Sequence, residues 1–201
     1  MEQVRVLSIH QKQEELSMNK YLAHLKTITK HKLYVGYYCF KCGQYKRGLL
    51  HDNSKFGPTE FFTSARYFQG DSSPIDAEKR EKEYSLAWQH HKGHNPHHWE
   101  YWLDELGTRK NKPIKMPWPY LVEMMCDWIG AGKVYNKGKW TTAEPINFFE
   151  KKRPYMILNP RTEKVVVYLL ELIRDHGLST FCYTVKHPEM SKVLSNYLKG
   201  E

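Results

Sequence analysis

The sequence contains at residues 49–56 the stretch Leu49-Leu50-His51-Asp52-Asn53-Ser54-Lys55-Phe56. His51 and Asp52 are adjacent, so an imidazole nitrogen and a carboxylate oxygen are available to one cation. This donor set suits zinc, manganese, iron or nickel better than calcium. Lys55 follows Asp52 by about one helical turn, where its ammonium could meet an anionic group held by that cation. Because a lone His-Asp pair often arises by chance, the metal-site prediction depends on further ligands elsewhere.

The composition is that of a single globular chain with an excess of basic residues. Lys and Arg number 31 and Asp and Glu number 22 among 201 residues, which gives a net charge of +9. This length allows one well-cored domain, or one domain with an appendage. The charge favours anionic partners such as nucleotides, phosphorylated metabolites or nucleic acid. The basic residues form no dense run, so a solvated lysine surface is an equally good interpretation.

The chain shows no sign of a membrane segment or of a disulfide framework. No apolar stretch approaches the roughly 20 residues of a membrane helix, and residues 1–5 lack the apolar segment of a signal peptide. We therefore expect a cytoplasmic protein. Its four cysteines do not suggest paired disulfides at this length. Cys39 and Cys42 have the spacing of a zinc knuckle but no second such pair follows, so we interpret them as core residues one helical turn apart.

Proline-free segments with helical periodicity predict an all-α fold with no strands. We expect residues 1–16 to form a polar lead-in, residues 17–140 a helical core and residues 141–201 a helical extension packed on that core. The expected helices cover residues 17–42, 47–55, 58–68, 76–92, 97–106, 119–129, 160–176 and 188–198, with Asp76 and Asn95 as caps and Gly177 as a terminator.

Histidines occur on the apolar faces of several of these helices. His31 belongs to a stripe at steps of three and four with Ile28 and Val35. Taken alone, it is more simply interpreted as a core histidine bonded to a backbone carbonyl. His91 shares a face with Ala87 and is a better ligand candidate than His90, which lies about 100° around the helix.

Two further candidates come from residues 97–127. His98 borders the apolar side of its predicted helix, and His97 lies nearly opposite, which favours His98 only weakly. Asp127 lies within the most apolar helix of the chain, where an ionised carboxylate is costly to bury unless it is paired or bound to a metal. The alternative places Asp127 at an exposed edge of that helix beside Glu123.

These residues follow the order H…HD…H…H…D, with a Lys three residues after the His-Asp pair. This order resembles the HD-domain superfamily of metal-dependent phosphohydrolases and related oxygenases. Several blocks more narrowly resemble the uncharacterised DUF5662-type family of bacteriophages and bacteria, over about residues 20–140. The blocks are residues 30–35 (KHKLYV), 50–56 (LHDNSKF), 87–91 (AWQHH), 95–102 (NPHHWEYW) and 126–131 (CDWIGA).

The HD resemblance implies a helical bundle around a metal centre that holds one or two divalent transition metal ions, such as Mn, Fe, Co, Ni or Zn. It implies that His31, His51, Asp52 and Asp127 are the ligands of one metal. His91 and His98 would complete a second metal position, with Asp52 bridging. A one-metal site in which His91, His97 or His98 acts on the substrate is the alternative, because these histidines are more closely spaced than the extra ligands of many dinuclear HD proteins.

The function predicted from this pattern is hydrolysis of a phosphate ester or anhydride in a nucleotide or another small anionic substrate. Asp52, Lys55 and His97 are the candidate catalytic residues. The alternatives are an HD-type di-iron oxygenase and a non-catalytic phage protein that sequesters a nucleotide in the host cytoplasm. Nucleic acid binding is the weakest alternative, since the sequence contains no recognisable nucleic-acid-binding module. The sequence does not predict an oligomeric state.

Overall fold

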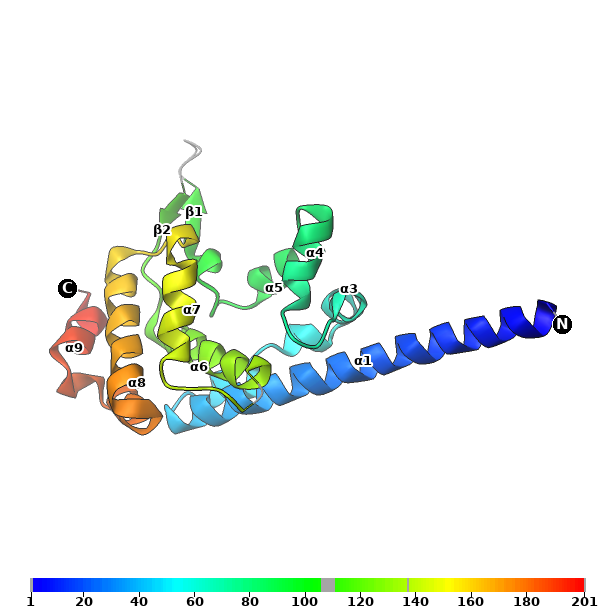
Figure 1. Cartoon of the computed structure of the whole chain (residues 1–201). Coiled ribbons are helices and arrows are strands. Elements are labelled where there is room, and N and C mark those ends of the chain that lie inside the picture. Colours follow the sequence, from blue (N-terminus) through cyan, green and yellow to red (C-terminus); the bar gives the residue numbers. More distant parts are fainter. Residues whose placement is uncertain (1, 106–110, 137, 201) are drawn as a thin grey trace. The chain divides into compact units, whose positions relative to one another are not determined.

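The computed structural model describes residues 2–105, 111–136 and 138–200, with side chains described over 19–104, 111–136 and 138–200. The described chain is mostly helical, so the predicted all-α class is confirmed at that level. Figure 1 shows the helices α1 (Glu2–Lys41), α2 (Tyr45–Leu50), α3 (Pro58–Tyr67), α4 (Pro74–Lys82), α5 (Leu86–His94), α6 (Trp118–Tyr135), α7 (Glu144–Lys152), α8 (Pro160–Lys186) and α9 (Lys192–Lys199). Short 3₁₀ helices are η1 (Asn53–Phe56), η2 (Trp99–Trp102), η3 (Arg153–Tyr155) and η4 (Pro188–Met190).

The chain divides into two compact units. Unit 1 comprises Met1–Lys30 and Asn53–His91, and unit 2 comprises His31–Asp52 and Lys92–Glu201. The division therefore falls within α1 and again within α5. His31, His51, Asp52, His97, His98 and Asp127 all belong to unit 2, whereas Lys55 and His91 belong to unit 1.

The core of unit 2 is built around α6. This helix contacts α2, α7 and α8, and α9 packs on α8. Its residues from Leu121 to Asp127 are all buried, as are Ile129 and Gly130. A helix that is apolar around its circumference is stable only when other elements cover it on all sides. The two acidic residues of α6, Glu123 and Asp127, are thereby placed inside unit 2.

A glycine allows the unit 2 segment of α1 to approach α6 closely. A Cβ atom at Gly130 would lie 2.5 Å from Val35 Cγ2 and 3.3 Å from Val35 N, too near for any side chain without movement. Val35 is about one turn after His31, and Gly130 is about one turn after Asp127. This contact therefore sets the separation of the two helices where His31 and Asp127 face each other.

Unit 1 has a smaller core formed by α3, α4 and the part of α1 before residue 31. α3 packs on α4, and Ala65 and Phe68 are buried. The ring of His24 lies 5.4 Å from that of Phe61 and 5.3 Å from that of Phe68. Burial, together with the positive charge of Lys55, lowers the pKa of His24 to about 4. His24 is therefore a neutral, core-facing ring near pH 7.

Three predicted helices are wrong in detail. The helix expected over residues 47–55 is divided into α2 and η1 by a turn at His51 and Asp52, where Asp52 has a positive φ of 52°. The helix expected over residues 76–92 is divided into α4 and α5, since Glu83 adopts a left-handed conformation (φ 68°) that ends α4, and Ser73, not Asp76, is the N-cap residue. The helix expected over 97–106 is only the four-residue η2. It leads into the strand β1 (Leu103–Glu105), which pairs antiparallel with β2 (Asn111–Pro113). Cross-strand hydrogen bonds there satisfy backbone groups that a longer helix would have paired internally.

Other expectations are met or extended. The segment predicted as a lead-in is helical, because α1 begins at Glu2. Gly177 interrupts α8 with φ 81° and ψ 175°, as expected for a glycine at a helix break. Cys39, in α1, and Cys42, directly after its last residue, are buried core residues, as interpreted. The beginning of α9 is capped by the side chain of Ser191, which accepts from the amide of Leu194.

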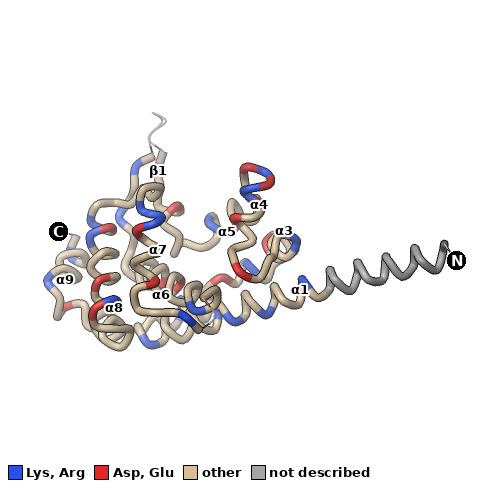
Figure 2. The backbone as a smooth tube through the Cα atoms, in the orientation of Figure 1, with Lys and Arg blue, Asp and Glu red and all other residues tan. Residues whose placement is uncertain are grey.

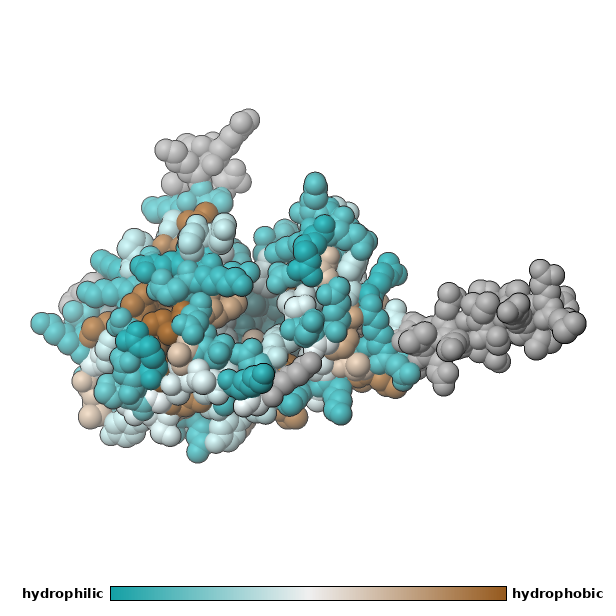
Figure 3. All heavy atoms as spheres, viewed as in Figure 1, coloured by the Kyte–Doolittle hydropathy of each residue, from teal (hydrophilic) through white to brown (hydrophobic). Residues whose placement is uncertain are grey.

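The described surface carries charge on many elements. Figure 2 shows Lys and Arg spread over several helices of both units, with no single element collecting them. Figure 3 shows a visible face that is mainly hydrophilic, with smaller hydrophobic areas. Within the described residues, no helix combines the length and apolar character needed to cross a membrane.

Candidate metal centre

The His-Asp pair lies in a turn directly after α2. Asp52 has a positive φ of 52°, an uncommon conformation for a residue other than glycine. The ammonium of Lys32 holds this turn by donating to the carbonyl oxygens of His51 at 2.6 Å and Leu49 at 2.9 Å. His51 and Asp52 are each only 1% exposed. The backbone bend, which Lys32 of α1 stabilises, thus directs the side chains of His51 and Asp52 into unit 2.

Four buried side chains converge at this turn: His31, His51, Asp52 and Asp127. His31 Nε2 lies 3.0 Å from Asp127 Oδ1 and 3.4 Å from Asp52 Oδ2. His51 Nε2 lies 3.3 Å from Asp52 Oδ2 and 3.3 Å from His31 Nε2. Each of the four offers one ligand atom, and these atoms lie within 4.8 Å of one another. The sequence-predicted ligands of one metal are therefore brought together in one place.

The charges in this cluster shift the pKa values strongly. Burial alone would lower the pKa of His51, but the carboxylates of Asp52, Asp127 and Glu123 outweigh it and raise the pKa to about 10. Burial alone would likewise raise the pKa of Asp127, yet hydrogen bonds from His31 and His51 hold it well below its usual range. The cluster thus concentrates negative charge around the imidazole nitrogens, which is the electrostatic setting of a cation site.

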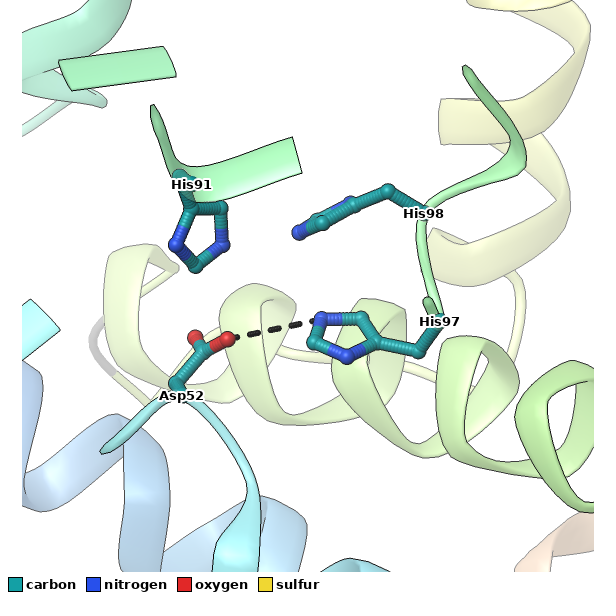
Figure 4. A group of neighbouring side chains, drawn as sticks. All are labelled: Asp52, His91, His97 and His98. Atoms are coloured by element: carbon teal, nitrogen blue, oxygen red, sulfur yellow. Dashed lines mark ion pairs between the residues drawn. The ribbon is translucent and has the colours of Figure 1, made fainter. Parts of the chain in front are cut away.

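A second donor set meets the other oxygen of Asp52. His97 Nε2 lies 3.4 Å from Asp52 Oδ1, the ion pair drawn dashed in Figure 4. His98 is next to it, with ring centroids 4.2 Å apart, and also directs a nitrogen toward this place. Ligand atoms of Asp52, His97 and His98 lie within 4.8 Å of one another. Asp52 therefore presents one oxygen to each of two donor sets within unit 2.

The sequence left His97 and His98 as alternatives, and both contribute to this second set. His97 is 1% exposed and is the more deeply buried of the two. Helical periodicity could not predict the direction of the His97 side chain, because the helix expected to begin at this residue is replaced by η2 and β1. His98 is the residue that precedes η2.

The two remaining sequence-predicted site residues belong to unit 1. Lys55 lies in η1. His91 is 1% exposed, and its Nδ1 donates to Glu60 Oε2 at 2.7 Å. His90 Nδ1 lies 2.7 Å from the other oxygen of Glu60. The prediction that His91 faces inward is confirmed by its burial, and its role as a ligand stays a prediction, as does the role of Lys55.

Glu123 was missed as a site residue. It is 4% exposed, and its Oε1 lies 3.0 Å from His51 Nδ1 and 3.2 Å from His97 Nδ1. The sequence did contain a signal, since Glu123 is four residues before Asp127 and so shares its helix face. Asp127 is 8% exposed, so the alternative that placed both acids at an exposed edge is wrong.

The first donor set fits a transition metal ion. Two imidazoles and two carboxylates suit zinc, iron, manganese, cobalt or nickel. Ligands held about 2.0–2.1 Å from one ion in a tetrahedron lie about 3.3 Å from each other. In the structure, the separations between the ligand atoms of this set include 3.0, 3.3, 3.3, 3.4 and 3.7 Å. The chain therefore has buried His/Asp clusters that could hold a metal ion.

Comparison with known proteins gives one family. Neither the curated proteins nor the solved structures contain a match to this chain. A family model described as a family of unknown function, DUF5662, matches residues 20–172. The match includes every candidate residue of both donor sets as well as Glu123. The chain therefore belongs to the DUF5662 family.

Proposed function

We propose that this protein is a metal-dependent hydrolase that acts on a phosphate ester or anhydride, with a nucleotide or another small phosphorylated molecule as substrate. The observation that carries the proposal is the buried set His31, His51, Asp52 and Asp127, whose ligand atoms converge within 4.8 Å. Their order along the chain resembles that of HD-domain phosphohydrolases. The net charge of +9 favours an anionic substrate.

The residues of unit 2 would hold one or two divalent ions. A metal bound to such a donor set polarises a phosphoryl oxygen and lowers the pKa of a coordinated water toward neutrality. Asp52 is the residue shared by both sets, because its Oδ2 faces His31 and His51 while its Oδ1 faces His97. Asp52 is therefore the side chain whose loss should affect the site most.

We assign His97 to the second donor set together with His98. Its Nε2 is directed at Asp52 Oδ1, and its Nδ1 is directed at Glu123 Oε1. With both ring nitrogens engaged by carboxylates, His97 is better suited to hold an ion than to transfer a proton to the substrate. This assignment revises the expectation of a catalytic His97. A role of Lys55, which belongs to unit 1, in offsetting charge on the phosphate stays a prediction.

The test begins with elemental analysis of the purified protein. A hydrolysis screen of nucleotides, cyclic nucleotides and simple phosphate esters with several divalent metals then follows. We expect metal-dependent phosphate release that is lost in Asp52→Ala, with helical content unchanged by circular dichroism. Asp175→Ala is the matched control, because Asp175 is exposed and its ion pair is with the neighbouring Arg174, away from both donor sets in the sequence. Full activity in Asp52→Ala, or tight nucleotide binding without turnover under every metal tested, would contradict the proposal.

A di-iron oxygenase is the second candidate. The observation that favours it is the same division of the two Asp52 oxygens between two donor sets, which is an arrangement suited to two ions of one kind. Metal content separates the candidates. Two irons per chain with oxygen consumption would support oxygenation, whereas phosphate release under anaerobic conditions would support hydrolysis.

A further inference from the structure

Glu123 contacts both histidines that flank Asp52. One oxygen, Oε1, lies 3.0 Å from His51 Nδ1 and 3.2 Å from His97 Nδ1. The two rings lie side by side, with centroids 4.5 Å apart and an interplanar angle of 41°. Glu123 lies on α6, His51 follows α2, and His97 precedes η2. A single carboxylate thus joins three separate segments of unit 2.

The opposite edges of the same rings face Asp52. His51 Nε2 lies 3.3 Å from Asp52 Oδ2, and His97 Nε2 lies 3.4 Å from Asp52 Oδ1. Each imidazole is therefore held between Glu123 on its Nδ1 side and Asp52 on its Nε2 side. Because an imidazole ring is rigid, fixing Nδ1 also fixes where Nε2 points.

The chemistry of Glu123 determines where the ring protons lie. Its Oε1 is the atom that the Nδ1 atoms of both His51 and His97 face, and the Glu123 side chain is only 4% exposed. Arg47 Nη1, 3.9 Å from the second oxygen of Glu123, adds a compensating positive charge. An ionised carboxylate can only accept, so each histidine must donate from Nδ1. Nε2 of each ring, which faces Asp52, is then the nitrogen left to bind an ion.

We propose that Glu123 is a positioning residue that orients His51 and His97 together, so that one buried carboxylate governs both donor sets meeting at Asp52. Histidines that bind metals in proteins commonly donate their other N–H to such a carboxylate, which fixes the ring and its tautomer. The consequence for metal binding and turnover rests on the proposed function. The orientation of the two rings does not.

The sharpest rival places an ion on the Nδ1 side. His51, His97 and Glu123 could themselves form a three-ligand site, since their ligand atoms also lie within 4.8 Å of one another. In that arrangement both Nδ1 atoms would be unprotonated and bound to the metal. In the arrangement we propose, both Nδ1 atoms keep their protons when metal is present.

The experiment compares the wild-type chain with Glu123→Leu and Glu123→Gln, in metal-free and zinc-loaded protein. Leu has no acceptor, whereas Gln keeps an acceptor oxygen without the charge. Glu78→Gln is the matched control, because Glu78 is also buried at 1% exposure but accepts from Ser85, not from a histidine. The measurements are nitrogen-15 NMR of the imidazole N–H groups and zinc affinity by chelator competition.

We expect Nδ1–H resonances of His51 and His97 in the wild-type protein, with and without zinc. Both should disappear in Glu123→Leu and persist in Glu123→Gln. Zinc affinity should fall about 100-fold in Glu123→Leu and about 10-fold in Glu123→Gln, with every bound equivalent weakened. Glu78→Gln should leave the resonances and the zinc affinity unchanged.

Several results would overturn the inference. These are loss of the wild-type Nδ1–H resonances on zinc loading, their persistence in Glu123→Leu, or an effect of Glu123→Leu on only one of two bound zinc equivalents. If Glu123→Leu does not fold, Glu123→Gln provides the test. An unchanged zinc affinity in Glu123→Gln would then overturn the inference. If the wild-type protein binds no zinc, the resonances of the metal-free proteins alone decide the role of Glu123, and the proposed function is decided separately by the elemental analysis and the hydrolysis screen with other divalent metals.

Discussion

Each of the two units contains a buried glutamate that contacts two histidines through their Nδ1 atoms. In unit 1, Glu60 is 2% exposed and lies 2.7 Å from the Nδ1 atoms of both His90 and His91, using one oxygen for each. In unit 2, Glu123 is 4% exposed and uses one oxygen for both His51 and His97. The local chemistry is nearly the same in the two units.

The surroundings of the two glutamates differ. Beyond Glu123, unit 2 adds Asp52 and Asp127, and the summed charge of these acids raises the pKa of His51 to about 10. Among the described residues of unit 1 taken alone, no three His, Cys, Asp or Glu side chains lie close enough to share an ion. In unit 1, the buried glutamate and its two histidines therefore do not bring three ligand atoms together. What distinguishes unit 2 is the further carboxylates of Asp52 and Asp127 around its imidazoles.

The largest expected effect is on zinc affinity, in a pair of variants that each remove one histidine, one from each unit. His31→Asn should lower zinc affinity at least about 100-fold, because it removes one of four converging ligands. His90→Asn is the unit 1 counterpart, and it should change zinc affinity by less than about threefold. Chelator competition with both variants measures the difference. Equal losses in the two variants would break the distinction between the regions.

Glu60→Leu should act on stability and not on zinc binding by the His31 set. It removes the carboxylate acceptor of the buried Nδ1–H of His91 and of the partly buried His90, which should cost about 2–3 kcal/mol in the free energy of unfolding. Glu60→Gln retains an acceptor and should cost about 1 kcal/mol. Urea denaturation of the metal-free proteins provides the measurement. An unchanged unfolding free energy in Glu60→Leu would show that the Glu60 contacts contribute nothing.

Gly130→Ala tests the helix approach that brings His31 to Asp127. The added methyl group meets Val35, so we expect a loss of about 1–2 kcal/mol in unfolding free energy and a weaker affinity for zinc. Gly93→Ala is the matched control, because a Cβ atom there meets nothing within 4 Å. In α5 it should stabilise the protein by up to about 1 kcal/mol. A Gly130→Ala protein with unchanged stability and affinity would show that the helices can separate freely.

The smallest expected effect is a pH dependence in unit 1. The pKa of His24 is about 4 in the folded protein against 6.5 for an ordinary histidine. The unfolded chain therefore binds this proton more readily between these values, and the stability that His24 confers above pH 6.5 is lost as the pH falls toward 4. We expect wild-type stability to fall by about 1 kcal/mol more than that of His24→Leu between pH 7 and pH 5. Parallel urea midpoints at the two pH values would contradict this expectation.

The sequence predicted much of the candidate site because its signals are local. Residues at steps of three and four must share a helix face, which placed His31 with Val35 and identified Asp127 as an acid within an apolar helix. The divided helix at Glu83 and the β1–β2 hairpin were not predicted, since they depend on a left-handed residue and on pairing across a loop. Periodicity contains no information about either.

What the sequence determined by itself is the helical class and the inward faces that carry His31 and Asp127. The sequence placed the His51-Asp52 pair within a helix, whereas the pair lies in a turn after α2. The tertiary structure alone decided which faces meet. The approach of α1 to α6 depends on Gly130 lying against Val35, and the role of Glu123 depends on two rings brought to it from distant segments. The reason is that side-chain direction follows from helix geometry, whereas the charge environment of a buried carboxylate is set by neighbours that only packing supplies.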